Sequence, residues 1–514
     1  MDEPSRVRLG ELVAAMSFVA DLGMGQSMEH VLRQTLIATR LGELAGIDPG
    51  EDATLYYVSL LAWIGCGSDS HQLAAWFGDD IAVRAGTYNV DMAGLPAMAY
   101  IARQAGEGQR GLERLWTKAL VTATGGRVMT NSIAAHCVTT RTFAQRLGLG
   151  PDVQIPLMQV FERWDGKGGP EGLKADEIAL PARIVHLTDI VAAFHRSGGK
   201  AAATEVARQR RGTQFDPELV DRFFGSADDI LEGVHEASTW EALLTQASLG
   251  PEMTQDELDG ALGALADFTD LKSPYLVGHA RGVAALVQQA AGAMGLNPDE
   301  IRRMYRAALV QDAGRMGVSN GIWDKQGPLS ETELERVRLH PYFLERMLSK
   351  VEGLVSVGSL AAQHHERLDG SGYPRGIGGS SISRAARLLG AADVYRALIE
   401  ERPHRAAFEP ESAARELRGE ARAGRLDGDA VEAVLVAAGH RSRALREWPA
   451  GLTAREVEVL GLIARGCSNR EVARRLHVAE KTVGNHIEHI YMKIGSSTRA
   501  EASLFAMQHG LLDI

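Results

Sequence analysis

Between positions 279 and 393, six histidine and aspartate side chains stand out as candidate metal ligands. They are His279, Asp312, His340, His364, His365 and Asp393. Imidazole nitrogens and carboxylate oxygens suit Fe, Mn or Zn, and one bridging carboxylate can hold two ions. Two ions about 3.5–4 Å apart can polarise a phosphate and generate a hydroxide near neutral pH. The set therefore predicts a two-metal centre that acts on phosphate esters.

The adjacent histidines His364 and His365 constrain the shape of this centre. If they lie on a helix, their side chains point about 100° apart. Both imidazoles can then serve one centre only if it is broad, as a two-metal centre is. The pair therefore favours two ions over one.

An internal repeat organises the elements that must position these residues. Residues 30–51 match residues 279–300 at a constant offset of 249, and residues 136–189 match residues 340–393 at an offset of 204. The change from 249 to 204 means that the first copy holds 45 extra residues between positions 62 and 136, in which we recognise no motif. The matches run ungapped through His, Asp, Gly and Pro, so chance similarity between alanine-rich helices does not explain them.

Both copies have helical patterns. After His279, apolar residues recur at helical spacing, namely Val283, Leu286 and Ala290. Asn297-Pro298 is expected to end this helix, and the next is expected over residues 302–310. Ser330 and Glu333 form a capping box that opens a further helix. Alternating β-strand patterns are scarce, which predicts an all-α fold.

The segment HHERLDGSGYP at positions 364–374 resembles the signature of the HD-GYP branch of the HD phosphohydrolases. The resemblance covers about residues 255–440 and includes QDAGRMGV upstream and AADVYRALIEERPHR downstream. It implies that the six residues above are metal ligands and that the substrate class is cyclic di-GMP. It also implies that basic residues after the last ligand hold the phosphates, and these are Arg396, Arg402 and Arg405.

Two positions depart from the family pattern. Gln311 stands where the family has the histidine of its His-Asp dyad, and Arg315 replaces a lysine. A neutral amide binds metals less well than imidazole does, although it still offers one oxygen. A guanidinium is bulkier than an ammonium. The resemblance implies catalytic roles for Asp312 and Arg315, but the lost ligand leaves open whether the site hydrolyses or only binds.

The first copy is more degenerate. Ala62-Trp63 occupies its dyad position and Val160-Phe161 its His-His position, whereas His30, His136 and Asp189 remain. Three scattered candidates do not make a two-metal centre. We therefore expect a catalytically inactive HD-like copy used for scaffolding, dimerisation or sensing, in which the turn glycines persist because the backbone needs them.

The C-terminal residues predict a DNA-reading module. Three capping boxes begin the first, second and fourth predicted helices, at Thr453, Ser468 and Thr498. The third helix has an apolar stripe of Val483, Ile487, Ile490 and Ile494. The segment LTAREVEVLGLIARGCSNREVARRLHVAEKTVGNHIEHIYMKIG resembles the LuxR-type helix-turn-helix. The resemblance implies that the domain binds DNA as a dimer. The expected DNA-binding residues are Lys481, Thr482, Gly484, Asn485 and Lys493, of which Lys493 meets a phosphate and Gly484 stands where many relatives have lysine.

Charge and composition set limits on the function. The chain of 514 residues has net charge −11, but residues 451–514 hold eight basic and seven acidic residues, net +1, so the rest carries −12. The overall acidity therefore does not exclude DNA as a partner, although a near-neutral module predicts weak nonspecific affinity. Three distant cysteines and the absence of a signal segment or long apolar run predict a cytoplasmic protein without membrane contact.

The sequence thus predicts three parts: a degenerate HD-like domain at residues 1–240, an HD-GYP-like domain at 255–440 and a four-helix LuxR-type domain at 450–514. The preferred function is a homodimeric transcriptional regulator whose HD copies sense a nucleotide, a metal or a partner. One alternative is an active metal-dependent cyclic di-GMP phosphodiesterase with a DNA-binding localiser. The other is a non-catalytic interaction scaffold in which neither copy binds a small molecule.

Overall fold

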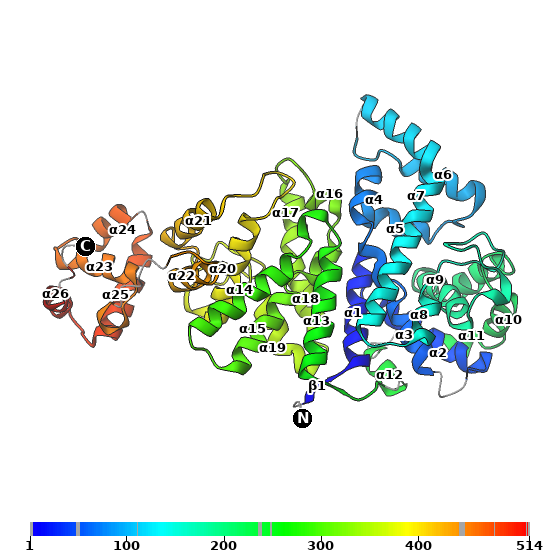
Figure 1. The fold of residues 1–514 in the computed structure, drawn as a ribbon, viewed down its shortest axis with the longest axis horizontal. Helices are drawn as coiled ribbons and strands as arrows, with labels where there is room; N and C mark the ends of the chain where they lie inside the picture. Colours follow the sequence, from blue (N-terminus) through cyan, green and yellow to red (C-terminus); the bar gives the residue numbers. More distant parts are fainter. Residues whose placement is uncertain are drawn as a thin grey trace. The chain divides into compact units, whose positions relative to one another are not determined.

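The computed structural model describes residues 4–47, 52–109, 111–234, 239–246, 249–441, 448–476, 478–509 and 511. The chain divides into two compact units, residues 1–438 and 439–514 (Figure 1). The fold is all-α, as predicted. Within the described residues, strands occur only as β1 (Pro4–Arg8) and β2 (Glu252–Thr254), which pair antiparallel. Positions 48–51 of the first repeat match lie outside the described residues.

The first half of unit 1 contains twelve α-helices and two 3-10 helices among the described residues. They are α1 (Leu9–Gly23), α2 (His30–Ala45), α3 (Asp52–Leu61), η1 (Ile64–Gly67), α4 (Ser70–Phe77), α5 (Asp80–Thr87), α6 (Gly94–Gln104), α7 (Gly111–Arg146), α8 (Pro151–Leu157), η2 (Ala175–Glu177), α9 (Leu180–Gln209), α10 (Pro217–Gly225), α11 (Ala227–Leu231) and α12 (Thr239–Gln246).

The second half of unit 1 repeats part of this order. It contains α13 (Gln255–Asp270), η3 (Pro274–Leu276), α14 (His279–Ala293), α15 (Pro298–Val310), η4 (Ala313–Gly317), α16 (Asn320–Trp323), α17 (Glu331–Arg338), α18 (His340–Leu348), η5 (Glu352–Leu354), α19 (Val355–Ala361), η6 (Gly379–Ser381), α20 (Arg384–Leu398), α21 (Pro410–Arg422) and α22 (Gly428–Ala437). Helix α15 begins earlier than the sequence predicted. Asn297 caps it by accepting the backbone N–H of Glu300, and Pro298 occupies its first turn.

The two sequence copies have matching local geometry. His30 and His279 are the first residues of α2 and α14. The carboxylates of Asp21 and Asp270 accept backbone N–H groups at these helix starts. Each copy also has one cis peptide bond at the matching proline, Gly169-Pro170 and Tyr373-Pro374. The predicted repeat is therefore present in three dimensions.

The turn of each copy requires its glycine. At Gly372 an added Cβ would lie 2.4 Å from the backbone nitrogen of Arg367, and at Gly168 it would lie 2.5 Å from that of Arg163. Both distances are too short for any side chain. Close approach of the backbone thus explains why the first copy keeps this glycine.

The extra residues of the first copy form α4, α5, α6 and the first turns of α7. They enclose a small apolar cluster of their own, made of Leu73, Phe77, Val83, Tyr100, Ala105 and Val121. The segment that showed no motif is therefore a folded addition to the first copy.

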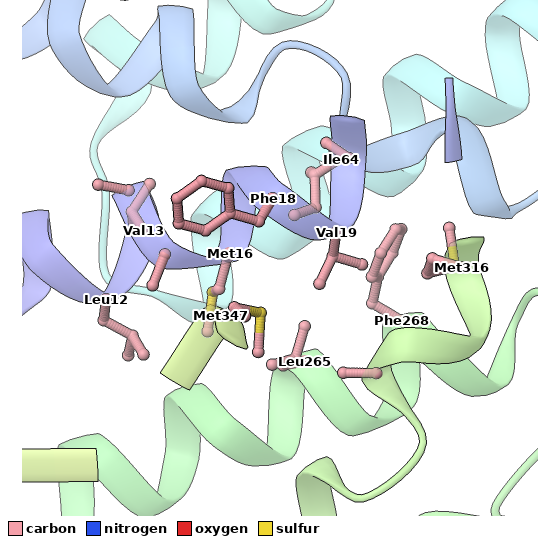
Figure 2. Packing of buried hydrophobic residues seen from close by; sticks show 14 of the residues in the cluster. Leu12, Val13, Met16, Phe18, Val19, Ile64, Leu265, Phe268, Met316 and Met347 are labelled. Atoms are coloured by element: carbon pink, nitrogen blue, oxygen red, sulfur yellow. The ribbon is translucent and has the colours of Figure 1, made fainter. Parts of the chain in front are cut away.

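Helix α1 joins the two copies through a shared core. Figure 2 shows Leu12, Met16 and Val19 of α1 turned toward α13 of the second copy, where they meet Leu265 and Phe268. The side chains of Phe18 and Ile64 lie on the other side, within the first copy. Burial of these side chains on both sides of α1 makes the two copies parts of one compact unit.

A buried charged junction also connects the copies. Asp80, at the start of α5, is fully buried, and Lys272 of the second copy lies 3.4 Å from it with 1% of its side chain exposed. The Ser319 hydroxyl and the Asn320 backbone N–H donate to the same carboxylate at 2.7 and 2.8 Å. Nη1 of Arg84 lies 3.2 Å from Oδ2 of Asp80, so a second positive charge stands beside this carboxylate. The added segment therefore fixes the start of α16 in the second copy.

Unit 2 contains η7 (Pro449–Gly451), α23 (Ala454–Ala464), α24 (Asn469–Leu476), α25 (Glu480–Ile494) and α26 (Arg499–Gln508). The predicted capping boxes are present at Thr453, Ser468 and Thr498. Of the predicted stripe on α25, Val483 and Ile490 are buried, and Ile487 and Ile494 pack against the same core. Four helices around one small core match the prediction for this region.

Candidate metal centre and DNA-binding helix

Five different elements bring the six predicted ligands together. His279 and His340 begin α14 and α18, and Asp393 lies in the middle of α20. Asp312 precedes the 3-10 helix η4. His364 and His365 lie in a turn directly after α19 rather than on a helix. The helix ends at Ala361, so the geometry of the turn, with ring centroids 4.0 Å apart, directs both imidazoles into the site.

The ligands form two groups that share one carboxylate. Asp312, His340, His364 and His365 make one group, and His279, Asp312 and Asp393 make the other; within each group the candidate ligand atoms lie within 4.8 Å of one another. Asp312 Oδ1 is 3.6 Å from Nε2 of both His340 and His364, whereas Oδ2 is 3.6 Å from Nε2 of His279. This is the arrangement expected of a carboxylate that bridges two ions.

Three of the imidazole rings, those of His340, His364 and His279, are oriented by a hydrogen-bond contact at Nδ1, the nitrogen that faces away from Asp312. Nδ1 of His340 and His364 donates to the carbonyls of Val337 and Ala361 at 2.6 and 2.7 Å. Nδ1 of His279 instead lies 2.7 Å from Oε2 of Glu400. Such partners fix the ring so that Nε2 faces the site. Glu400 is not among the site residues predicted from the sequence, although it lies within the AADVYRALIEERPHR segment of the family resemblance.

Burial and neighbouring charges set the protonation of the site. Burial and the adjacent His364 lower the pKa of His340 to about 3, and burial holds the pKa of His365 well below its usual value. Burial also opposes charge on His279, but hydrogen bonds to Asp393 and Glu400 overcome it and raise its pKa to about 9. His340 and His365 are therefore neutral near pH 7, which is the form that binds metals.

The donor set fits a divalent metal. Both oxygens of Asp312 are buried without a hydrogen-bond partner, and so is Oε1 of Gln311. Gln311 Nε2 donates to Asp393 at 3.0 Å, which leaves its oxygen as the free end of the amide. Buried polar atoms without partners are rare because they cost free energy, and an ion would satisfy all three. The site residues present, Gln311 included, are thus compatible with metal.

Arg315 is held beside Asp312. Its Nε lies 2.8 Å from Asp312 Oδ1, without hydrogen-bond geometry, and its guanidinium lies 4.6 Å from the ring centroid of Trp323. The Arg315 cation and the surrounding histidines overcome burial and hold the pKa of Asp312 well below its ordinary value. Asp312 is therefore ionised near neutral pH, the form in which a carboxylate could hold a metal ion.

The three arginines after Asp393 have different surroundings. Arg396 lies 2.6 Å from Glu400 with a third of its side chain exposed, and Arg402 donates to Glu400 at 2.8 Å. Arg405 donates instead to four backbone carbonyls around the end of α20, among them Leu398 and Ala406. Phosphate binding by the three stays a prediction. For Arg405 it would require bonds to these carbonyls to be given up.

The predicted DNA-binding residues lie on or near the exposed face of α25. Lys481, Thr482 and Asn485 are exposed and Gly484 is half-buried. Lys493 differs, because its Nζ lies 2.7 Å from the carboxylate of Glu456. Glu456 is also the acidic member of the capping box of α23. A phosphate contact by Lys493 would therefore compete with an ion pair inside the domain.

Comparison with known proteins agrees with this geometry. The profile described as HD domain matches residues 128–219 and 263–430, about half of the chain, and falls in both sequence copies. The chain belongs to the HD domain family. The profile of bacterial regulatory proteins of the luxR family matches residues 450–506. Both predicted resemblances are confirmed.

The relatives of this HD protein include named phosphodiesterases. The 3'3'-cGAMP-specific phosphodiesterase 3 of Vibrio cholerae is 29% identical over 405 residues, which cover 78% of this chain and 88% of the relative. The response regulator RpfG of Xanthomonas campestris, a cyclic di-GMP phosphodiesterase, is 38% identical over 30% of this chain and 40% of its own length. The crystal structure of the cyclic GMP-AMP-specific phosphodiesterase V-cGAP3 of V. cholerae superposes with a TM-score of 0.59 at 25% identity, covering 84% of this chain and 98% of that one.

The first HD copy has lost this site through substitution by apolar groups. Trp63, Phe161 and His136 pack together, with ring centroids 4.8 to 6.3 Å apart, and Nε2 of His136 bonds to the carbonyl of Ala62. His30 pairs with Asp189 at 2.8 Å, and the hydroxyl of Tyr88, from the added segment, donates to the same carboxylate. Across the described residues, groups of metal-capable side chains occur only in the second copy.

No helix in the described parts of the chain combines the length and the apolar composition needed to span a bilayer.

Proposed function

We propose that this HD protein is a DNA-binding regulator whose second HD copy binds divalent metal and a cyclic dinucleotide. The observation that carries the proposal is Asp312, whose two buried oxygens lack hydrogen-bond partners and face two separate groups of ligands. The LuxR-type domain in the same chain provides the regulatory output. The relatives named as cyclic dinucleotide phosphodiesterases support this class of ligand.

The residues of the second copy have distinct roles in this proposal. His340, His364 and His365 would hold one ion, His279 and Asp393 the other, and Asp312 both. The ions, when bound, would polarise a phosphodiester and activate a water molecule. Arg396 and Arg402 lie next to Glu400, the partner of His279, so a bound phosphate would compete with that carboxylate for both guanidinium groups.

Hydrolysis of the bound dinucleotide is the second candidate function. It is favoured because each ligand group still offers at least three candidate ligands without the residue at position 311. The only family ligand replaced in the second copy is at Gln311, whose amide oxygen is buried without a hydrogen-bond partner. Turnover, if present, would make the regulator an enzyme that removes its own ligand.

A scaffold without any small-molecule ligand is the least supported alternative. Such a protein would gain nothing from the buried polar cluster, and it would bear the cost of unsatisfied Asp312 oxygens at about 1–3 kcal/mol or more. Apolar side chains fill the corresponding region of the first copy. The contrast between the copies favours a ligand in the second.

Four measurements on the purified full chain test the proposal. Metal content should approach two ions per chain in the wild type and fall strongly in Asp312→Ala. Calorimetry should detect binding of cyclic di-GMP or 3'3'-cGAMP to the metal-loaded chain, and HPLC of the incubated nucleotide reports turnover. Electrophoretic mobility shift with and without the nucleotide reports regulation of DNA binding. Absence of both metal and nucleotide affinity would favour the scaffold.

Two further expectations accompany this proposal. Cytoplasmic location and homodimerisation remain predictions from the sequence. Dimerisation is part of the regulatory mechanism, since a helix-turn-helix dimer reads two half-sites and their spacing depends on the dimer geometry.

A further inference from the structure

The segment added to the first copy presents an uncovered apolar face. On α7, four side chains point outward at helical spacing: Leu112, Leu115, Trp116 and Leu120 are 83%, 65%, 72% and 41% exposed. On the opposite face of the same turns, Thr117 and Val121 are buried. One face of α7 therefore packs onto the HD unit, and the other, equally apolar, is exposed among the residues that the structure describes.

Helix α6 carries a second stripe of the same kind. Leu95 and Met98 are 80% and 61% exposed, and the exposed alanines Ala99 and Ala102 continue the spacing i, i+3, i+4, i+7. The inner face of α6 is anchored by Tyr100, whose hydroxyl donates to the Val83 carbonyl at 2.6 Å. No charged residue interrupts either stripe.

The two helices form a hairpin that the HD fold does not require. They are consecutive, in contact and joined by a short loop, and the second HD copy has no counterpart of them. The start of α7 projects at the edge of unit 1 (Figure 1). Six large apolar side chains on two adjacent helices exceed the scattered exposed residues of an ordinary surface and mark an interaction site.

We propose that α6 and α7 are the homodimer interface, at which the hairpins of two chains associate as a four-helix bundle. A hairpin with one bare stripe on each helix is half of such a bundle, and a two-fold axis completes it with an identical surface. Residues 94–121 hold four basic and two acidic residues. Because each hairpin carries both signs of charge, a two-fold axis can set the two acidic side chains of one copy opposite basic side chains of the other.

This interface deepens the proposed function and rests on it in part. The DNA-binding domain carries net charge of only +1, so one copy has little electrostatic affinity for DNA. Joining two copies makes the second contact intramolecular and raises the overall affinity. A dimer surface on the first HD copy also gives that inactive copy a function.

The test measures oligomeric state without DNA, so that its outcome is separate from DNA binding. Sedimentation velocity of the full chain should show a dimer at micromolar concentration, and Leu112→Glu combined with Leu115→Glu should shift it to monomer. Ile155→Glu on α8 is the matched control, because Ile155 is 55% exposed on another face and should leave the dimer intact. Thermal denaturation should give the same midpoint for the control and the variant, since all three positions are exposed.

A cysteine cross-link identifies the partner. Cys66, Cys137 and Cys467 are buried, so Trp116→Cys introduces one accessible thiol near the expected two-fold axis. Mild oxidation should link two chains of this variant covalently, whereas Ile155→Cys should not link. A monomeric wild type, or a dimer that survives Leu112→Glu with Leu115→Glu, would overturn the interface. If the variant loses binding to anionic vesicles or another protein while the wild type is monomeric, the stripe serves that partner instead.

Discussion

Glu400 lies on the side of His279 that faces away from the candidate metals, with Oε2 2.7 Å from Nδ1. The guanidinium of Arg402 donates to the same oxygen, Oε2, at 2.8 Å. Nε of Arg396 lies 2.6 Å from the other oxygen, Oε1. One side chain thus links a metal ligand to the two arginines that we expect to hold phosphate. A ligand that draws these arginines away would alter the partner of His279.

Neutralising this carboxylate should weaken the metal centre. In Glu400→Gln the ring of His279 loses its charged partner, and removal of such partners typically lowers metal affinity about 10–100-fold. Metal titration with a competing chelator measures the change. Glu401→Gln is the matched control, because Glu401 is the exposed neighbour and should leave affinity unaltered. Equal affinity of Glu400→Gln and wild type would show that the contact is structural only.

Restoring the missing ligand should strengthen the centre. Gln311→His places an imidazole where the family has one, next to Asp312, and imidazole binds Fe, Mn or Zn better than an amide oxygen does. We expect tighter metal binding and a higher rate of cyclic dinucleotide turnover, measured by metal content and by HPLC. Gln311→Asn keeps the amide on a side chain that is shorter by one methylene group, and it serves as the comparison variant. A variant with no gain over wild type would mean that position 311 does not limit the site.

Breaking the junction between the copies should destabilise unit 1. Asp80→Asn leaves the Lys272 ammonium buried without its counter-charge, a change that typically costs about 3–5 kcal/mol of unfolding free energy. Urea denaturation measures it. Asp176→Asn breaks a pair whose carboxylate is 88% exposed and should cost less than about 1 kcal/mol. Similar losses in the two variants would contradict the importance of the junction.

The effect of Asp80 should depend on pH. Burial alone would raise the pKa of Asp80, but Lys272 and Arg84 overcome it and lower the pKa to about 2. Its stabilising contribution is therefore complete above the unfolded-chain pKa near 3.8 and is lost as the pH falls through about 2. The difference in stability between wild type and Asp80→Asn should shrink over that window, and a difference that stays constant from pH 5 to pH 2 would refute the assignment.

Adding a charge to α25 should strengthen DNA binding. A Cβ at Gly484 meets no atom within 4 Å, so Gly484→Lys introduces no clash. If position 484 meets phosphate, affinity should rise and the salt dependence should steepen by about 0.9 in the log–log slope. Gly484→Ala separates this from the gain of about 1 kcal/mol in helix stability. Fluorescence anisotropy over a range of salt concentrations measures both, and identical slopes in the two variants would place position 484 away from DNA.

The fold class and the repeat could be predicted from the sequence, and the resemblance to the HD-GYP branch implied the six candidate ligands. Capping boxes, helical spacing and the long HHERLDGSGYP segment are local patterns that need no distant contact to be recognised. The same holds for the four-helix C-terminal domain, whose caps at Thr453, Ser468 and Thr498 each involve residues only three apart.

Contacts between residues far apart in the chain could not be predicted, because they depend on how the helices pack. The folded structure places Glu400 against His279 across 121 positions and Asp80 of the added segment against Lys272, and it puts His364 and His365 in a turn. It also showed that the outer faces of α6 and α7 are bare. A stripe of leucines has the same pattern whether it faces a core or solvent, because helical periodicity records that a face is apolar and not what covers it.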